Sequence, residues 1–284
     1  MRLLRIGPPG RERPATLAGD GRLLDLSALT EDIDGAFLAG GGIDRARAAV
    51  DAGGLPELDP ALRVGPPVAR PGKIVCIGLN YSDHAREAGA PPPTEPVLFL
   101  KAPNTIVGPN DEVLVPRGSA KTDWEVELAV VIGRTARYLT GPERALAHVA
   151  GYTIANDVSE REFQLERGGT WDKGKSCETF NPLGPWLVTA DEVPDPQRLG
   201  MRLWVNGAAK QDGSTQNMIF GVAELVHYVS QFMVLEPGDV LNTGTPAGVA
   251  MGAPDPKPYL REGDVLELEI DGLGRQRQVV GQAR

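Results

Sequence analysis

The chain has 284 residues, of which 41% are hydrophobic and 24% are charged, as in an ordinary globular protein with a sizeable core. Its net charge of −9 at pH 7 argues against a nucleic-acid partner, which would require a basic stripe. No apolar run reaches the roughly 18 residues of a membrane span, and the short apolar start does not fit a secretory signal. Because the only cysteines, Cys76 and Cys177, lie far apart, we expect a cytoplasmic protein with reduced thiols.

Residues 1–66 are predicted to form a small N-terminal α/β domain. Its expected elements are strands at 1–6 and 23–26, a hairpin turn at Asp20-Gly21 and a helix at 42–52. No group of residues with evident chemistry lies in this part of the chain. A proline-rich connector at 64–73 follows, and we therefore place a second, larger domain at 67–284.

The second domain is predicted to consist mainly of strands. Short apolar runs predict strands at 73–78, 96–101, 122–133, 151–154, 187–188 and 203–205. Helical patterns predict helices at 82–89, 141–150, 159–167 and 222–233. Ser82 or Asp83 is expected to cap the first of these helices, and Gly89 to end it. We therefore expect a mainly β fold with short helices (α+β class) and largely antiparallel sheets.

The predicted strand at 122–133 carries two carboxylates on one face. Glu125 and Glu127 are two residues apart, which in a strand separates them by about 6–7 Å. A surface strand could carry such a pair without further meaning. However, the surrounding apolar residues indicate a strand buried on both faces. Buried like charges raise each other's pKa unless a cation lies between them, so a divalent metal is an economical interpretation.

Asp157 is a candidate for a third metal ligand. It follows the predicted strand at 151–154, at an end where a side chain can point into a pocket. An Asp before a helix is also a common N-cap, which is the alternative interpretation. Three carboxylate ligands without Cys or an adjacent His suit a hard ion. The set therefore favours Mg²⁺ or Mn²⁺ over Zn²⁺.

His84 and Glu87 form a candidate acid–base pair. They are three residues apart on a predicted helix and so share one face. An imidazole held by a carboxylate can act as a general base toward water. An ordinary exposed pair is the alternative. His148 and His227 lie in helical segments without nearby acids, and we interpret both as structural.

Several polar residues near Asp157 could receive an anionic substrate. They are Arg161 and Gln164, one helical turn apart, and Lys173 and Lys175 in the loop that follows. Solvated surface charge is the alternative interpretation.

Residues 169–176, GTWDKGKS, match the phosphate-binding pattern G-x-x-x-x-G-K-[ST]. That loop must follow a buried strand and open a helix. Here a polar, helix-like segment precedes the motif, and Pro182 and Pro185 follow it closely. We therefore do not expect nucleotide binding.

In sequence and in order, these segments resemble the fumarylacetoacetate hydrolase family, in particular bacterial members assigned to 2,4-diketo-3-deoxy-L-fuconate and acylpyruvate hydrolysis. The likeness is strong over residues 73–252 and weaker toward the C-terminal end. The segments that carry it are GLNYSDHAREAG, FLKAPNTIVGP, DWEVELAVVIG, YTIANDVSERE, WDKGKSCETFNPLGPW and NTGTPAGVAMG.

The resemblance implies a β-sandwich-roll catalytic domain and, usually, a homodimer. It implies Mg²⁺ or Mn²⁺ held by Glu125, Glu127 and Asp157. It implies a catalytic dyad of His84 and Glu87 on a lid helix that becomes ordered when substrate binds, with Lys175 near the metal. Substrate-binding roles are implied for Arg161, Gln164, Thr245 and, with a weaker match, Lys101.

The implied activity is metal-dependent hydrolysis of a carbon–carbon bond in a 2,4-diketo acid, with release of pyruvate. An isomerase, decarboxylase or lyase acting on a related 2-oxo acid is the first alternative, because the same enolate chemistry serves these reactions. A protein that binds a metal and a keto acid without turnover is the second. The pair of His84 and Glu87 favours hydrolysis, since binding alone requires no base.

Overall fold

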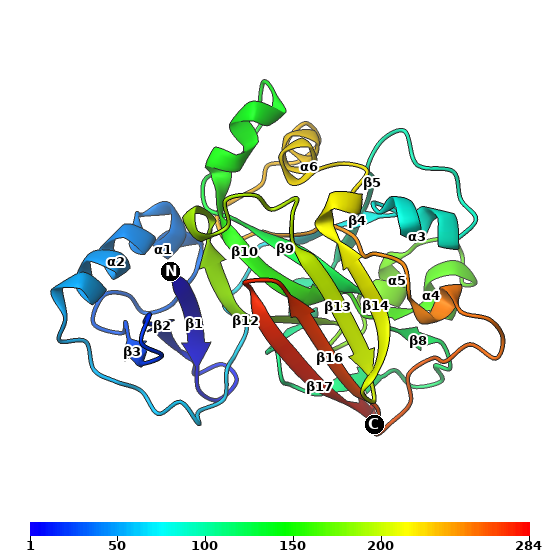
Figure 1. Cartoon of the computed structure of the whole chain (residues 1–284), viewed down its shortest axis with the longest axis horizontal. Coiled ribbons are helices and arrows are strands. Elements are labelled where there is room, and N and C mark those ends of the chain that lie inside the picture. Colours follow the sequence, from blue (N-terminus) through cyan, green and yellow to red (C-terminus); the bar gives the residue numbers. More distant parts are fainter.

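The structure is a computed structural model that describes residues 1–284, and strands dominate it (Figure 1). The largest sheet has ten strands in the order β3-β2-β1-β12-β10-β9-β15-β4-β5, with β6 beside β12. Most neighbours are antiparallel, whereas the pairs β4–β15 and β6–β12 are parallel. The strands are β1 (Arg2–Ile6), β2 (Arg13–Leu17), β3 (Leu23–Asp25), β4 (Ile74–Gly78), β5 (Val97–Lys101), β6 (Ile106–Val107), β9 (Val126–Ile132), β10 (Val149–Asn156), β12 (Asn181–Thr189) and β15 (Val240–Asn242).

A second sheet packs against the first and has the order β14-β13-β16-β17-β7. Its strands are β7 (Val113–Val115), β13 (Gly200–Val205), β14 (Ala208–Ser214), β16 (Val265–Ile270) and β17 (Gly274–Gln282). Buried residues alternate with half-buried ones along β13 and β16, because one face of this sheet meets the core. The largest apolar cluster joins Leu203 and Leu268 to Leu128 of the main sheet. The prediction of a mainly β fold is confirmed.

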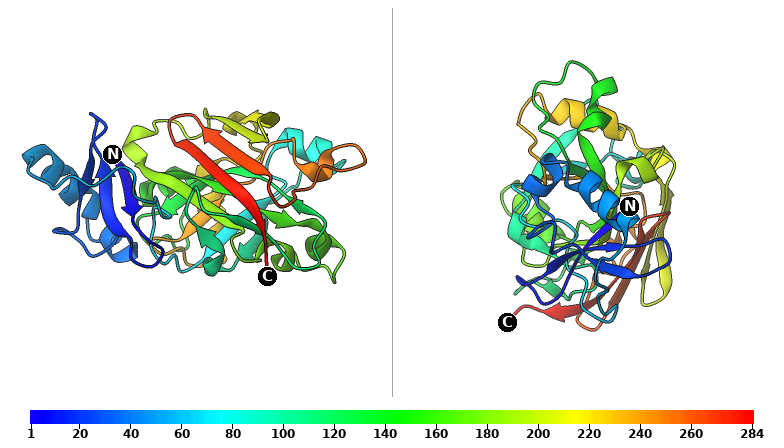
Figure 2. Two further views of the ribbon diagram at one scale, coloured as in Figure 1. Left: turned by 90° about the horizontal axis from the view of Figure 1, so that it is seen from below. Right: turned by 90° about the vertical axis from the view of Figure 1, so that its left-hand side faces the viewer.

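The N-terminal strands extend the main sheet. β1 pairs antiparallel with β12, so that Leu3 lies opposite Leu187. Leu3 and Leu187 also share an apolar cluster with Val131 of β9. Two helices, α1 (Gly35–Ala39) and α2 (Gly42–Ala52), cover this end of the molecule, as Figure 2 shows in blue. The helix predicted at 42–52 is confirmed, whereas the sequence analysis missed β2 and α1.

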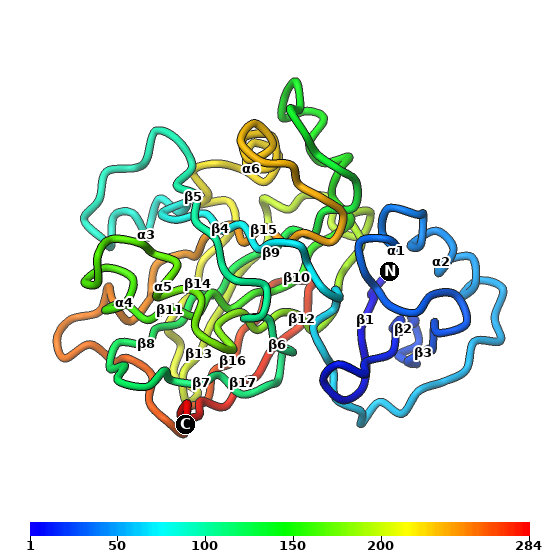
Figure 3. Tube along the Cα trace, turned by 180° about the vertical axis from the view of Figure 1, so that it is seen from behind, coloured from blue at the N-terminus to red at the C-terminus, as the bar shows by residue number.

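The remaining helices are short. They are α3 (Ser82–Glu87), α4 (Arg161–Leu165), α5 (Asp172–Lys175), α6 (Val222–Val229) and 3₁₀ turns at Pro103–Thr105, Pro142–His148, Ala190–Glu192, Thr215–Asn217 and Ala250–Gly252. α3, α4 and α5 gather at the end opposite α1 and α2 (Figure 3). No helix has the length and apolar character that crossing a membrane requires.

The strand predicted at 122–133 is interrupted, and the prediction of one continuous strand is wrong. Thr122–Asp123 forms β8, which pairs with β11 (Ser159–Glu160), and β9 begins only at Val126. Side chains replace strand partners at the break. The N–H of Trp124 donates to the Asp123 carboxylate (2.8 Å), and that of Glu125 donates to Asn156 Oδ1 (3.2 Å). The predicted burial of this segment is confirmed.

Four predicted helices differ from the structure in their details, and the one predicted at 222–233 already ends at Val229. The segment predicted as a helix at 141–150 is a 3₁₀ helix followed by the start of β10. The helix predicted at 159–167 begins as β11 and is α-helical only in α4. Tyr81 occupies the N-cap of α3 without a side-chain hydrogen bond, and Asp83 accepts the N–H of its neighbour His84 from within the helix. The capping role predicted for Ser82 or Asp83 is therefore wrong.

Candidate active site

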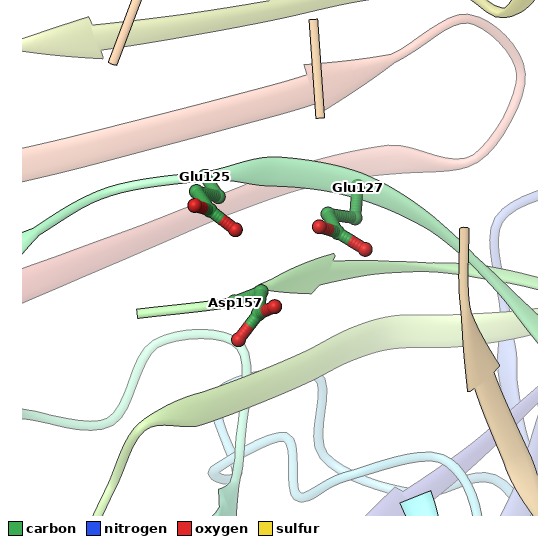
Figure 4. Close-up of side chains that lie close together, drawn as sticks. All are labelled: Glu125, Glu127 and Asp157. Carbon is green, nitrogen blue, oxygen red and sulfur yellow. The ribbon is translucent and has the colours of Figure 1, made fainter. Parts of the chain in front are cut away.

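Three buried carboxylates converge where β9 begins and β10 ends. Glu125 precedes β9, Glu127 lies within it, and Asp157 directly follows β10. The register of β9 and β10 pairs Ala155 with Glu127, so this end of β10 brings Asp157 beside the two glutamates. Each residue offers a carboxylate oxygen, and these oxygens lie within 4.8 Å of one another. Figure 4 shows the three side chains close together, with Glu125 and Glu127 directed toward the side on which Asp157 lies.

Three buried cations surround this cluster. Lys175 Nζ donates to Glu125 Oε2 and to Asp157 Oδ2, each at 2.8 Å. Lys101 Nζ donates to the other Asp157 oxygen, and Arg161 Nη2 donates to Glu125 Oε1 at 2.7 Å. All three cationic side chains are at most 4% exposed. Their burial is tolerated because each charge has a carboxylate partner.

Glu127 has no such partner. It accepts a hydrogen bond from the N–H of Gly244 at 2.8 Å and from no side chain. Burial, reinforced by the negative charges of Asp157 and Glu125, raises the pKa of Glu127 well above its usual range. Burial also opposes ionisation of Glu125, but the positive charges of Lys175 and Arg161 outweigh it and lower the pKa of Glu125.

The cluster has more carboxylates than cations. Counting Asp123, which also contacts Arg161, four buried carboxylates meet three buried cations, so ionising all four would leave one negative charge without a cationic partner. The donor set of Glu125, Glu127 and Asp157 is made of oxygen only. Both features fit a hard divalent ion such as Mg²⁺ or Mn²⁺.

Asp123 has a positioning role that the sequence analysis missed. Its carboxylate accepts the Nε–H of Arg161 at 2.9 Å and the N–H groups of Ala250 and Met251 at 2.7 and 2.9 Å. It therefore orients Arg161 and ties the loop after Gly248 to the site. Its place two residues before Glu125, on the same predicted face, was the available signal.

His84 and Glu87 meet on α3 as their spacing implies. His84 Nδ1 lies 3.1 Å from Glu87 Oε2, and the His84 side chain is 8% exposed. The other Glu87 oxygen accepts the N–H of Gly248 at 2.9 Å. Glu87 thus connects the histidine to the loop that also carries Thr245. A Cβ at Gly252 would overlap the Glu87 carboxyl group, so the close approach of Glu87 to the backbone at position 252 requires glycine.

A pocket of about 190 Å³ opens over the carboxylates. This volume is below the roughly 300–1,000 Å³ of sites for drug-sized ligands, as suits a small metabolite. The candidate site residues that line it are His84, Glu125, Glu127, Arg161, Gln164, Lys175 and Thr245. Lys101 is not in the lining and reaches the site through Asp157.

Thr245 is held from both sides. Its hydroxyl donates to the carbonyl of Val126 at 2.9 Å and accepts from Gln211 Nε2 at 2.8 Å. Gln211 Oε1 in turn accepts the N–H of Val126 at 2.9 Å. Gln211 comes from β14, far away in the chain, and no local signal in the sequence marks it.

The segment 169–176 forms no phosphate-binding loop. α4 precedes it and β12 follows it, so it neither leaves a strand nor opens a long helix. Lys175 turns toward the carboxylates, and Lys173 donates to the carbonyl of Arg167 at the surface. His148 and His227 do not line the pocket.

The family model for the C-terminal domain of fumarylacetoacetate (FAA) hydrolase matches residues 73–281. A relative from Burkholderia multivorans is 54% identical over the full length of both chains and has no more specific name than hydrolase.

Two solved structures show the range of activities among similar proteins. Maleylpyruvate hydrolase from Sphingobium sp. SYK-6, solved with manganese(II) and pyruvate, is 30% identical over all of both chains with a TM-score of 0.81. The 5-carboxymethyl-2-hydroxymuconate delta-isomerase from Mycobacterium smegmatis is 32% identical over all of both chains with a TM-score of 0.79. Since the family model covers most of the sequence and these likenesses span all of it, the chain belongs to the fumarylacetoacetate hydrolase family.

Proposed function

We propose that this protein hydrolyses the bond between C3 and C4 of a 2,4-diketo acid of the acylpyruvate type. The reaction consumes one water and yields a carboxylic acid and pyruvate. The observation that carries the proposal is one pocket lined by two triad carboxylates, by Lys175 and by a histidine paired with a carboxylate. The related hydrolase that was solved with manganese(II) and pyruvate supports it.

Glu125, Glu127 and Asp157 would hold the divalent ion, Mg²⁺ or Mn²⁺. When bound, such an ion supplies Lewis-acid polarisation of a 2-oxo acid and a template for its carboxylate. The buried carboxylate that Lys101, Arg161 and Lys175 leave without a cationic partner supports this assignment.

His84 is the proposed general base. Its Nδ1 is engaged with Glu87, which leaves Nε2 to accept a proton from water. The resulting hydroxide adds to C4. The C3–C4 bond then breaks, its electron pair stays on C3, and the proton returns from His84 to form the methyl group of pyruvate. Glu87 orients the imidazole, and Lys175 offers a hydrogen bond to developing negative charge.

The principal alternative is an isomerase or decarboxylase that acts on a related 2-oxo acid without activating water. The similar delta-isomerase from Mycobacterium smegmatis favours it. The histidine–carboxylate pair argues for hydrolysis over decarboxylation, because decarboxylation requires no base to deprotonate water. It also argues against a protein that only binds a keto acid.

The test uses protein freed of metal with a chelator and then supplied with Mg²⁺ or Mn²⁺. A panel of acylpyruvates and oxaloacetate is followed by loss of enol absorbance and by appearance of pyruvate. We expect metal-dependent release of pyruvate and of the matching acid from acylpyruvates. Turnover of oxaloacetate alone would support the decarboxylase, and no turnover of any substrate in the panel would refute both the hydrolase and the decarboxylase. The homodimer remains a prediction, which the mass of the protein in solution tests.

A further inference from the structure

We propose that the substrate of this pocket carries one carboxylate only and that its acyl group is uncharged and apolar. This inference rests on the proposed function and narrows its substrate class. It excludes acylpyruvates with a second, terminal carboxylate and those with a polyhydroxylated chain.

The first argument is that the pocket has no free cation for a second carboxylate. Only Arg161 and Lys175 among its lining residues are permanently positive. Arg161 donates from Nε to Asp123, from Nη1 to Gln164 and from Nη2 to Glu125, at 2.7–3.0 Å. The ammonium of Lys175 gives two of its three N–H groups to Glu125 and Asp157, and the third is the donor assigned above to the reacting 2-oxo acid. A distal carboxylate in this pocket would therefore be desolvated without a partner.

The second argument is the number of carboxylates already around the pocket. Glu125 and Glu127 line it, and Glu87 lies beside His84. A distal substrate carboxylate would add a like charge near these groups in a largely buried site, which is unfavourable.

The third argument is the apolar part of the lining. Half of the lining residues are hydrophobic, and among them only the Trp171 indole carries an N–H donor. The eight residues are Ile77, Leu79, Ala88, Ala90, Phe99, Leu165, Trp171 and Met251. Trp171 packs edge-on to Phe99, with ring centroids 5.5 Å apart. A Cβ at Gly78 would lie 2.5 Å from the Trp171 ring, so glycine lets the ring close in. Hydroxyl groups of a sugar-like chain would lose water here without gaining partners.

Cations just beyond the pocket are also engaged. Arg161, Leu165 and Met251 line both this pocket and a neighbouring surface pocket that contains Lys121 and Lys257. Lys121 pairs with Glu166, and Lys257 Nζ donates to two backbone carbonyls. Both lysines therefore have partners, and neither lines the pocket over the carboxylates.

The first experiment compares kcat/KM for acylpyruvates that differ only at the distal end, in the presence of Mg²⁺. Each added methylene that reaches the wall should raise kcat/KM by about 3–4-fold, until the pocket is full. A terminal carboxylate or a polyhydroxylated chain should lower it by about tenfold or more. Equal or faster turnover of those two classes would overturn this inference and leave the proposed function intact. No turnover of any acylpyruvate would overturn the proposed function.

The second experiment measures binding, and so does not depend on hydrolysis. Calorimetry with Mn²⁺ compares 2-oxohexanoate and 2-oxoadipate, which have the same chain length and differ by a terminal methyl or carboxylate. Neither has a 4-oxo group to be cleaved. We expect 2-oxohexanoate to bind about tenfold or more tightly. Equal affinities, or tighter binding of 2-oxoadipate, would refute the inference whatever the kinetic result.

A substitution at the rim gives the third experiment. Leu165→Arg adds a cation beside the apolar wall and should raise the relative affinity for 2-oxoadipate about tenfold. Leu146→Arg is the matched control, because Leu146 is similarly exposed, at 42% against 48%, and lies outside the pocket. The control should keep the wild-type preference. The same shift in both variants would mean a general charge effect and would contradict the contact of the acyl group with the apolar part of the lining.

Discussion

Lys175 donates a hydrogen bond of 2.8 Å to Glu125, although fifty positions separate them in the chain. The same ammonium reaches Asp157, whereas Glu127 is left with a backbone N–H alone. Positive charge is therefore distributed unequally over the three proposed metal ligands. Glu125 is stabilised as a carboxylate in the metal-free protein, and Glu127 is not.

Glu125→Gln should abolish metal-dependent activity, because an amide is a much weaker ligand for a hard ion than a carboxylate. We expect the affinity for Mn²⁺, measured by calorimetry, to fall by more than about 100-fold. Substituting a residue that only supports a ligand typically lowers metal affinity by about 10–100-fold, and loss of a ligand should cost more. The thermal stabilisation that metal confers on the wild type should vanish with it. Glu166→Gln, at an exposed carboxylate paired with Lys121, is the control and should leave metal binding unchanged. Full activity of Glu125→Gln would show that the ligand assignment is wrong.

The raised pKa of Glu127 predicts that the stability of the metal-free protein depends on pH. Its pKa is raised in the folded state, so the native protein holds this proton more tightly than the unfolded chain does. The contribution of this proton to the free energy of unfolding is fully present below pH 4.5, the ordinary pKa of a glutamate, and is lost as the pH rises through the raised pKa. Glu127→Gln should remove this loss, making the metal-free variant more stable than the wild type at neutral pH.

Urea unfolding of both proteins in a chelator, between pH 4.5 and 8, measures this difference. Excess Mg²⁺ should make the wild type more stable than the Glu127→Gln variant, since only the wild type can bind the ion tightly. A difference between variant and wild type that does not change with pH would contradict the assigned cause.

His84→Ala should slow acylpyruvate hydrolysis by about 10²–10⁴-fold, the usual contribution of a general base. Affinity for the divalent ion should be unchanged, because His84 is not among the carboxylate ligands. Decarboxylation of oxaloacetate is expected to persist, since it requires no activated water. Equal loss of both activities would point to a disordered α3 instead of a missing base. Glu87→Gln should retain more activity than His84→Ala, because the imidazole remains.

Asp123→Asn tests the positioning role of Asp123. The substitution keeps the shape of the side chain but removes the charge that faces Arg161 and two backbone N–H groups. Breaking a buried pair in this way should lower the free energy of unfolding by about 3–5 kcal/mol. Asp271→Asn removes an exposed partner of Arg202 and should cost less than about 1 kcal/mol in the same urea titration. Similar small losses in both variants would show that Asp123 has no special role.

Local patterns predicted much of the secondary structure. Apolar runs correctly indicated β4 and β5, and the helix at 42–52 has the predicted bounds. The failures occurred where side chains replaced backbone partners, as at Trp124 and Glu125, or where a turn tightened to 3₁₀ geometry at Pro142–His148. These outcomes depend on acceptors such as Asn156, which local periodicity does not show.

The sequence by itself determined which chemical groups are available and in which order they occur. The spacing of Glu125 and Glu127, with apolar residues around them, was enough to suggest a buried pair of acids, and the ordered segments indicated the family. For each candidate site residue an ordinary structural role, such as an N-cap or an exposed charge, remained an alternative. Spacing along one strand or helix does not show which residues from other parts of the chain lie nearby.

Only the tertiary structure decided how these groups meet. The register of β9 and β10 brings Asp157 to Glu127, and the fold places Lys101, Arg161 and Lys175 so that one carboxylate stays uncompensated. The polarity of the pocket is likewise a tertiary property, since its wall comes from segments that are distant in sequence. The physical reason is that charge compensation and desolvation depend on distances through space, which strand register and packing set.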